Sequence, residues 1–158
     1  MPGFELIGKE EQDALNKIFT ESGGVLFAHG FPAQRNGIYH VREFEKEFAN
    51  HFKVKHATAV SSGTAALKVA LKAVGVQPGD EVITQDFTFI ASVEAILDLG
   101  AKPVIAAADA SLNMDVEDFR RKITPKTKAV MPVHMLGFPA NIEAICTIAK
   151  EKGIAVIE

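Results

Sequence analysis

The stretch VSSGTAAL at Val60–Leu67 leads from a β-branched segment into a helical one through two serines and a glycine. The first N–H groups of a helix have no acceptor within the helix and lie at the positive end of its dipole. Gly63 allows a ligand to approach the backbone closely, and the hydroxyls of Ser62 and Thr64 add donors, so the stretch outlines a site for an anion such as a phosphate. Ser61 or Ser62 could equally do no more than cap the helix, and for an isolated stretch of this kind capping is the commoner role. Because the stretch matches neither GxGxxG nor GxxxxGK[ST], a dinucleotide fingerprint and a Walker A loop are both absent here.

Short apolar segments alternate with helical patterns around this stretch. We expect strands at 56–60, 81–85, 102–106, 128–134 and 154–157, and helices at 62–74, 88–99, 115–122 and 140–152. Gly75, Gly100 and Gly153 follow three of these helices and can take the left-handed conformation that ends a helix. Strands that are apolar throughout and separated by helices indicate a mostly parallel sheet covered on both faces. The predicted fold class is therefore α/β, a three-layer αβα arrangement.

Two more helices are predicted before the sheet, at 10–20 and 41–52. The second has an apolar stripe that we expect in the core, consisting of Val41, Phe44, Phe48 and Phe52. Between the two helices, residues 23–40 contain four glycines and a proline without a sustained period, and we expect a loop. Such a long segment is either a binding loop or interface arm, or simply disordered. We therefore divide the chain into N-terminal helices and loop at 1–53 and a sheet domain at 54–158.

Two further elements follow strands and so lie at the same carboxyl edge of the sheet as Gly63, where ligands bind in such folds. The first is DFTFIAS at Asp86–Ser92, in which Phe87 or Phe89 could stack on a flat heterocycle, or both rings could pack into the core. The second is His134, which could meet a ligand or be a structural histidine. The other histidines, His29, His40, His51 and His56, show no spacing that would form a metal cluster with it, so no metal site is predicted.

The composition excludes several classes of protein. With 158 residues, 47% hydrophobic and 23% charged, the chain fits one globular domain and neither a disordered chain nor a coiled coil. A net charge of −3 with both signs mixed argues against nucleic-acid binding. The single cysteine, Cys146, is expected to be buried and inert and indicates a reducing compartment, the cytoplasm. The sequence contains no GxSxG nucleophile elbow, so a hydrolase is not indicated. Met1–Asp13 does not resemble a signal peptide, and no apolar run is long enough for a membrane span.

A set of motifs occurs in one order along nearly the whole chain. They are REFEKEFANHF at Arg42–Phe52, SSGTAAL at Ser61–Leu67, PGDEVIT at Pro78–Thr84, FTFIAS at Phe87–Ser92, GAKPV at Gly100–Val104, LNMD at Leu112–Asp115, ITPKTKAVMPVHMLGFPANIEAI at Ile123–Ile145 and GIAVIE at Gly153–Glu158. Together they resemble the DegT/DnrJ/EryC1/StrS family of sugar aminotransferases, which are fold-type-I enzymes dependent on pyridoxal phosphate. The resemblance implies the N-terminal portion of an aspartate-aminotransferase-like large domain, with the C-terminal remainder outside this chain.

The resemblance also implies roles for individual residues. The backbone N–H groups of Gly63 and Thr64 would hold the cofactor phosphate, and Phe89 would stack on the pyridine ring. In the family the last strand continues into an Asp that pairs with the pyridinium nitrogen, and the Schiff-base Lys follows later, so both lie beyond Glu158. We therefore assign no catalytic residue within this chain and expect the isolated chain to be inactive. The implied reaction transfers an amino group from an amino acid, glutamate by expectation, to a keto sugar nucleotide in a cytoplasmic homodimer.

Two departures from the family pattern bear on the substrate. Ala107 stands where the family usually has Asp, and the loop at 23–40 is longer than the common version. Within that loop, Arg35 or Asn36 could contact the phosphate of a nucleotide sugar. Two alternatives stay open: a sugar dehydratase of the same family, in which the Schiff-base Lys is replaced, and a cofactor-free remnant or binding module. An isolated sheet that ends at Ile157 would leave an edge and apolar helix faces uncovered, so we expect it to self-associate.

Overall fold

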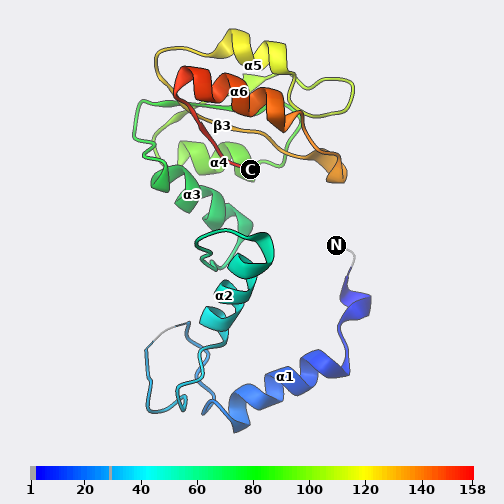
Figure 1. Cartoon of the computed structure of the whole chain (residues 1–158), viewed down its shortest axis with the longest axis vertical. Coiled ribbons are helices and arrows are strands. Elements are labelled where there is room, and N and C mark those ends of the chain that lie inside the picture. Colours follow the sequence, from blue (N-terminus) through cyan, green and yellow to red (C-terminus); the bar gives the residue numbers. More distant parts are fainter. Residues whose placement is uncertain (1–2, 29) are drawn as a thin grey trace. The chain divides into compact units, whose positions relative to one another are not determined.

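A computed structural model describes residues 3–28 and 30–158, so Met1, Pro2 and His29 lie outside the described residues (Figure 1). The chain divides into two compact units, Met1–Ala59 and Val60–Glu158. This division falls later in the chain than the boundary that we expected after residue 53. No helix in the described part of the chain combines the length and the apolar character that crossing a membrane requires.

The second unit contains a parallel sheet of four strands. The strands are β1 (Glu81–Gln85), β2 (Lys102–Ala106), β3 (Thr127–Met131) and β4 (Ala155–Val156), in the order β2-β1-β3-β4. All residues of β1 are buried because it lies inside the sheet, between β2 and β3. The register runs from Glu81 opposite Lys102 to Gln85 opposite Ala106, so β1 and β2 end side by side. The predicted parallel sheet is confirmed.

Helices cover both faces of this sheet (Figure 1). They are α3 (Gly63–Ala73), α4 (Ala91–Leu97), α5 (Val116–Lys122) and α6 (Ile142–Lys152). Val82 packs with Leu71 and Ile96 of α3 and α4, whereas the next residue, Ile83, packs with Phe119 and Ile145 of α5 and α6. This alternation follows from the two-residue period of a strand and gives one apolar core on each face. The three-layer αβα arrangement is therefore confirmed.

One expectation about secondary structure and one about burial are wrong. Residues 56–60 form no strand, because none of the described strands pairs with them, and the Ala59 N–H donates to Glu45 Oε1 at 2.8 Å instead. Cys146 is exposed and not buried. The core face of α6 is formed by Ile145, Ile148 and Ala149, at three- and four-residue spacing, and a residue directly after Ile145 points about 100° away from that face.

The first unit consists of a short 3-10 helix, η1 (Phe4–Leu6), then α1 (Lys9–Thr20), the expected loop, and α2 (His40–Phe52). Among its described residues, no apolar side chain is buried. The expectation that the stripe on α2 forms core is wrong for its rings, since Phe44, Phe48 and Phe52 are 44–57% exposed. These rings contact one another, with centroids 5.7 and 4.5 Å apart, because the described part of the unit provides no second apolar layer to cover them.

Candidate functional site

The carboxyl edge of the sheet brings together the loops that follow β1 and β3. The chain runs from β1 to β2 on one side and then crosses to β3 on the other side of β1. The direction of winding therefore reverses beside β1. In open parallel sheets, ligands bind outside the carboxyl ends of the strands at such a reversal.

The N-terminus of α3 offers backbone donors. Ser62 is the N-cap, and its hydroxyl oxygen accepts a hydrogen bond from the Ala65 N–H at 3.1 Å. The capping role is thus the right interpretation for Ser62. The N–H groups of Gly63 and Thr64 lie in the first turn of α3, where no helix carbonyl precedes them to accept a hydrogen bond. They are therefore available to a ligand. A Cβ placed on Gly63 would meet no atom within 4 Å, which means that the space beside this backbone is open.

A hollow of about 490 Å³ lies beside this helix end. It is lined by Gly63, Thr64, Ala66 and Leu67 of α3 and by Phe89, Ala91 and Ser92. The three residues that we expected to bind a cofactor therefore line one hollow. The Phe89 ring is 76% exposed and Phe87 is 46% exposed, so the alternative that both pack into the core is wrong. An open apolar ring facing free N–H donors suits a ligand that combines a flat ring with an anionic group.

His134 follows β3 at the same edge, and its ring is held at both nitrogens. Nδ1 accepts a hydrogen bond from the Ala140 N–H at 2.9 Å, so the proton of the neutral ring is on Nε2. Nε2 then donates to Glu158 Oε2, also at 2.9 Å. This geometry fits the structural alternative for His134. Among the described residues, no group of three His, Cys, Asp or Glu side chains could hold a metal ion, and His29 lies outside them.

Two buried amide side chains at this edge were missed by the sequence analysis. Gln85, the last residue of β1, is 0% exposed, and Asn113, in the loop after β2, is 1% exposed. Asn113 falls within LNMD, one of the stretches that carry the family resemblance, but the sequence analysis assigned no role to either amide. The available signal for Gln85 was only that an amide ends a short strand, where a buried polar group must find partners.

A carboxylate fixes the start of the loop after β2. Asp118, on α5, accepts hydrogen bonds from Lys122 Nζ and from the Ala107 N–H, both at 2.7 Å. Arg121 lies 3.0 Å from the other carboxylate oxygen. These donors, with Lys122 the strongest, lower the pKa of Asp118 to about 2. Asp118 therefore stays ionised at neutral pH and holds the chain at Ala107, just beyond the end of β2.

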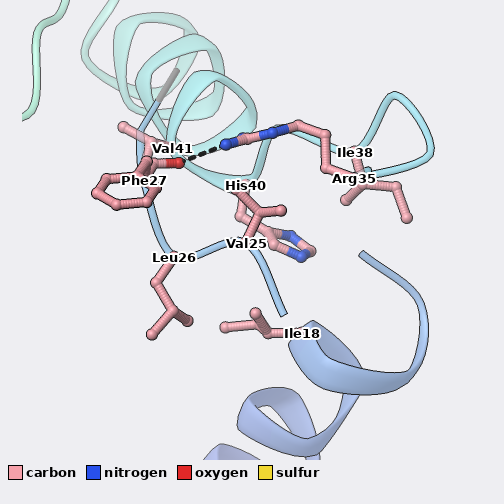
Figure 2. Close-up of a pocket in the computed structure, with 8 residues that line it drawn as sticks. All are labelled: Ile18, Val25, Leu26, Phe27, Arg35, Ile38, His40 and Val41. Carbon is pink, nitrogen blue, oxygen red and sulfur yellow. Dashed lines mark hydrogen bonds between the residues drawn. The ribbon is translucent and has the colours of Figure 1, made fainter. Parts of the chain in front are cut away.

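The loop of the first unit encloses a smaller pocket of about 110 Å³ (Figure 2). Its lining residues are Ile18, Val25, Leu26, Phe27, Arg35, Ile38, His40 and Val41. Arg35 is 3% exposed, donates to the Phe27 carbonyl at 2.7 Å and lies 4.5 Å from the centroid of the Tyr39 ring. Asn36 Nδ2 donates to the Glu21 carbonyl at 2.8 Å. Both side chains thus have partners within the first unit, and their contact with a substrate phosphate stays a prediction.

Comparison with known proteins assigns the chain to a family. The profile of the DegT/DnrJ/EryC1/StrS aminotransferase family matches residues 34–158. The chain belongs to this family. The match begins inside the loop of the first unit and includes all of the sheet unit. It therefore contains Gly63, Thr64 and Phe89, the three residues of the hollow that the resemblance had singled out.

Two curated relatives show how far the likeness extends. GDP-perosamine synthase from Vibrio cholerae is 48% identical over 120 residues, which are 75% of this chain and 33% of that protein. UDP-N-acetyl-3-dehydro-alpha-D-glucosamine 3-aminotransferase from Acidithiobacillus ferrooxidans is 40% identical over 144 residues, which are 90% of this chain and 38% of that protein. This member of the DegT/DnrJ/EryC1/StrS family thus spans about a third of the length of the relatives it matches.

Two solved structures have the same fold. A 3-amino-5-hydroxybenzoic acid (AHBA) synthase superposes with a TM-score of 0.86 at 38% identity, over 98% of this chain and 38% of that one. NtdA from Bacillus subtilis, solved with bound cofactor PMP, gives a TM-score of 0.84 at 31% identity, over 97% of this chain and 34% of that one. The chain therefore has the fold of the matching 34–38% of these two structures.

Proposed function

We propose that this chain is part of a longer enzyme that uses pyridoxal phosphate to transfer an amino group from an amino acid, expected to be glutamate, to a keto sugar nucleotide. The observation that carries the proposal is the hollow at the carboxyl edge, where the α3 N-terminus and Phe89 face one open volume in a chain of this family. The PMP in the NtdA structure supports the cofactor assignment, since PMP is the amino form of pyridoxal phosphate.

The residues of the hollow fit this cofactor. The N–H groups of Gly63 and Thr64 would donate to the phosphate at the positive end of the α3 dipole. The Phe89 ring would lie against the pyridine ring and keep water from that face. When bound, pyridoxal phosphate supplies the electron sink for amino-group transfer. Because the Asp partner of the ring nitrogen and the Schiff-base Lys are expected beyond Glu158, we propose only binding and orienting roles for this chain.

The substrate class and the assembly are also part of the proposal. The names of both curated relatives include a nucleotide that carries a sugar, and one names an amino transfer at position 3 of that sugar. They support an enzyme that acts on a nucleotide-linked sugar, and they do not favour a dehydratase or a cofactor-free remnant. We further propose a cytoplasmic homodimer, which the uncovered rings of α2 support because an obligate partner surface would bury them.

A product analysis of the full-length enzyme tests this function. The enzyme is incubated with pyridoxal phosphate, glutamate and a panel of nucleotide-linked 3-keto and 4-keto sugars, and the products are identified by mass spectrometry. We expect one amino sugar nucleotide to form together with an equal amount of 2-oxoglutarate. A product that has lost water without gaining nitrogen would show the dehydratase instead. Absence of any cofactor-dependent product would contradict the proposal.

A further inference from the structure

The side chain of Gln85 links three loops at the carboxyl edge. Its Nε2 donates to the Phe87 carbonyl at 2.9 Å and to the Leu112 carbonyl at 3.1 Å. Its Oε1 accepts a hydrogen bond from the Val133 N–H at 3.1 Å. Both amide protons and the amide oxygen are therefore used, in a side chain that is 0% exposed.

The position of Gln85 in the sheet explains why one residue reaches all three loops. It ends β1, whose two neighbours are β2 and β3, and it lies opposite Ala106, the last residue of β2. Phe87 belongs to the loop after β1, Leu112 to the loop after β2, and Val133 to the segment after β3. The amide therefore sits at the reversal of the winding direction, beneath the place where a ligand would bind.

Other polar contacts at this edge leave a distinct role for Gln85. Asn113 joins the loop after β2 to the segment after β3, since its Oδ1 accepts from the Met135 N–H at 2.9 Å. Asp86 accepts from the Ala108 N–H at 2.9 Å and ties the start of the loop after β1 to the loop after β2. The Gln85 contact at Phe87 holds the β1 loop two residues before the exposed Phe89 ring.

We propose that Gln85 is a positioning residue for the cofactor, which acts by holding the loop that carries Phe89 at a fixed height above the sheet. This inference rests on the proposed function for the identity of the ligand, while the loop anchoring rests on the hydrogen bonds alone. Replacing the amide by an apolar group leaves two carbonyls and one N–H without this partner, so the loops can separate. The Phe89 ring then loses its fixed position, and binding must first restore that order.

The test uses the full-length protein with Gln85→Met, which keeps the length of the side chain and removes its hydrogen bonds. Thr84→Val is the matched control, because Thr84 is the preceding residue and equally buried, yet its hydroxyl donates at 3.0 Å to the Met131 carbonyl within the sheet. Two quantities are measured at a temperature where every variant is folded. They are the hydrogen-exchange rates of residues 86–92 and of the Val133 amide without cofactor, and the Kd for pyridoxal phosphate.

We expect Gln85→Met to speed exchange in both regions and to raise the Kd for pyridoxal phosphate about tenfold, whereas Thr84→Val changes the Kd less than about twofold. Gln85→Glu keeps an acceptor for the Val133 N–H but loses both donors. It should retain protection at Val133 and lose it at residues 86–92, which keeps the proposal testable if Gln85→Met does not fold.

Two results would overturn the positioning role. Unchanged exchange in Gln85→Met and Gln85→Glu would show that the amide does not hold the loops. Faster exchange with an unchanged Kd would show that the loops are held but that the cofactor does not depend on them. If the unmodified protein does not bind pyridoxal phosphate at all, the proposed function fails and the cofactor role of Gln85 fails with it, while the exchange data still decide the loop anchoring separately.

Discussion

Phe89→Ala in the full-length enzyme should weaken the binding of pyridoxal phosphate without destabilising the fold. The Phe89 ring is 76% exposed beside the hollow, so the sheet loses little packing when it is removed. A cofactor ring that covers about 40 Å² of the Phe89 face would gain about 1 kcal/mol from burial. Ring stacking adds about 0.5–1.5 kcal/mol. The sum of about 1.5–2.5 kcal/mol corresponds to a rise in Kd of roughly 10- to 70-fold.

The assay is an equilibrium titration of each apoprotein with pyridoxal phosphate, followed by absorbance, together with a thermal melt. Phe138→Ala is the matched control, because Phe138 is 68% exposed in the same unit but does not line the hollow. We expect the control to leave the Kd unchanged and both variants to melt within a few degrees of the unmodified protein. Equal Kd values for Phe89→Ala and the unmodified protein would refute the stacking role, and a large drop in melting temperature would refute the view that the ring is free of the core.

Three further predictions concern the sheet unit. Phe119→Ala should lower the free energy of unfolding by about 3–5 kcal/mol in chemical denaturation, because this ring is 0% exposed in the core under α5 and α6; a loss below about 1 kcal/mol would contradict that core. Ser62→Ala should cost about 1 kcal/mol by removing the N-cap of α3, whereas Ser62→Asn should restore most of it, and equal melts of the two variants would exclude capping. The hydrogen bonds from Lys122 and the Ala107 N–H hold the pKa of Asp118 at about 2, below the usual range of an aspartate, so its contribution to stability is complete above about pH 4 and is lost as pH falls toward 2. Asp118→Asn should therefore lower stability by at most about 2 kcal/mol at pH 7 and flatten the acid limb of a stability-against-pH curve, and an unchanged acid limb would contradict the assignment.

The sheet could be predicted from the sequence because its pattern is local. β1 and β2 have the bounds that we predicted, 81–85 and 102–106, since short apolar segments between helices and glycines define a buried parallel strand. Residues 56–60 show the limit of this reasoning. Their composition suits a strand, but a strand also needs a neighbour, and none of the described strands lies beside them.

Burial was harder to predict than secondary structure. The stripe Phe44, Phe48 and Phe52 has the period of a core-facing helix, yet its rings are exposed, because a period shows which side of a helix is apolar and not what covers it. Cys146 shows the same error, since it was expected to be buried and is exposed, although its neighbour Ile145 is buried.

At the candidate site, the sequence predicted the backbone donors and the ring but not the side chains that hold them. VSSGTAAL and FTFIAS are recognisable stretches, and the structure brings Gly63, Thr64 and Phe89 to one hollow. Gln85 could not be found in this way, because its role depends on contacts that are distant in the sequence. Its partner Leu112 is 27 residues away and its partner Val133 is 48 residues away. Only the parallel topology brings those backbone groups to one amide.

The most direct test of the central claim is the intact mass of the native protein, measured before and after borohydride reduction in the presence of pyridoxal phosphate. Borohydride makes a cofactor–lysine linkage permanent. The measurement therefore reports both the length of the protein and the presence of the Schiff-base lysine, which is expected outside this chain. We predict a mass well above 17.0 kDa that gains one stable cofactor adduct. A mass that matches the 17.0 kDa of these 158 residues, with no specific adduct, would contradict the claim that this chain works as part of a pyridoxal phosphate enzyme.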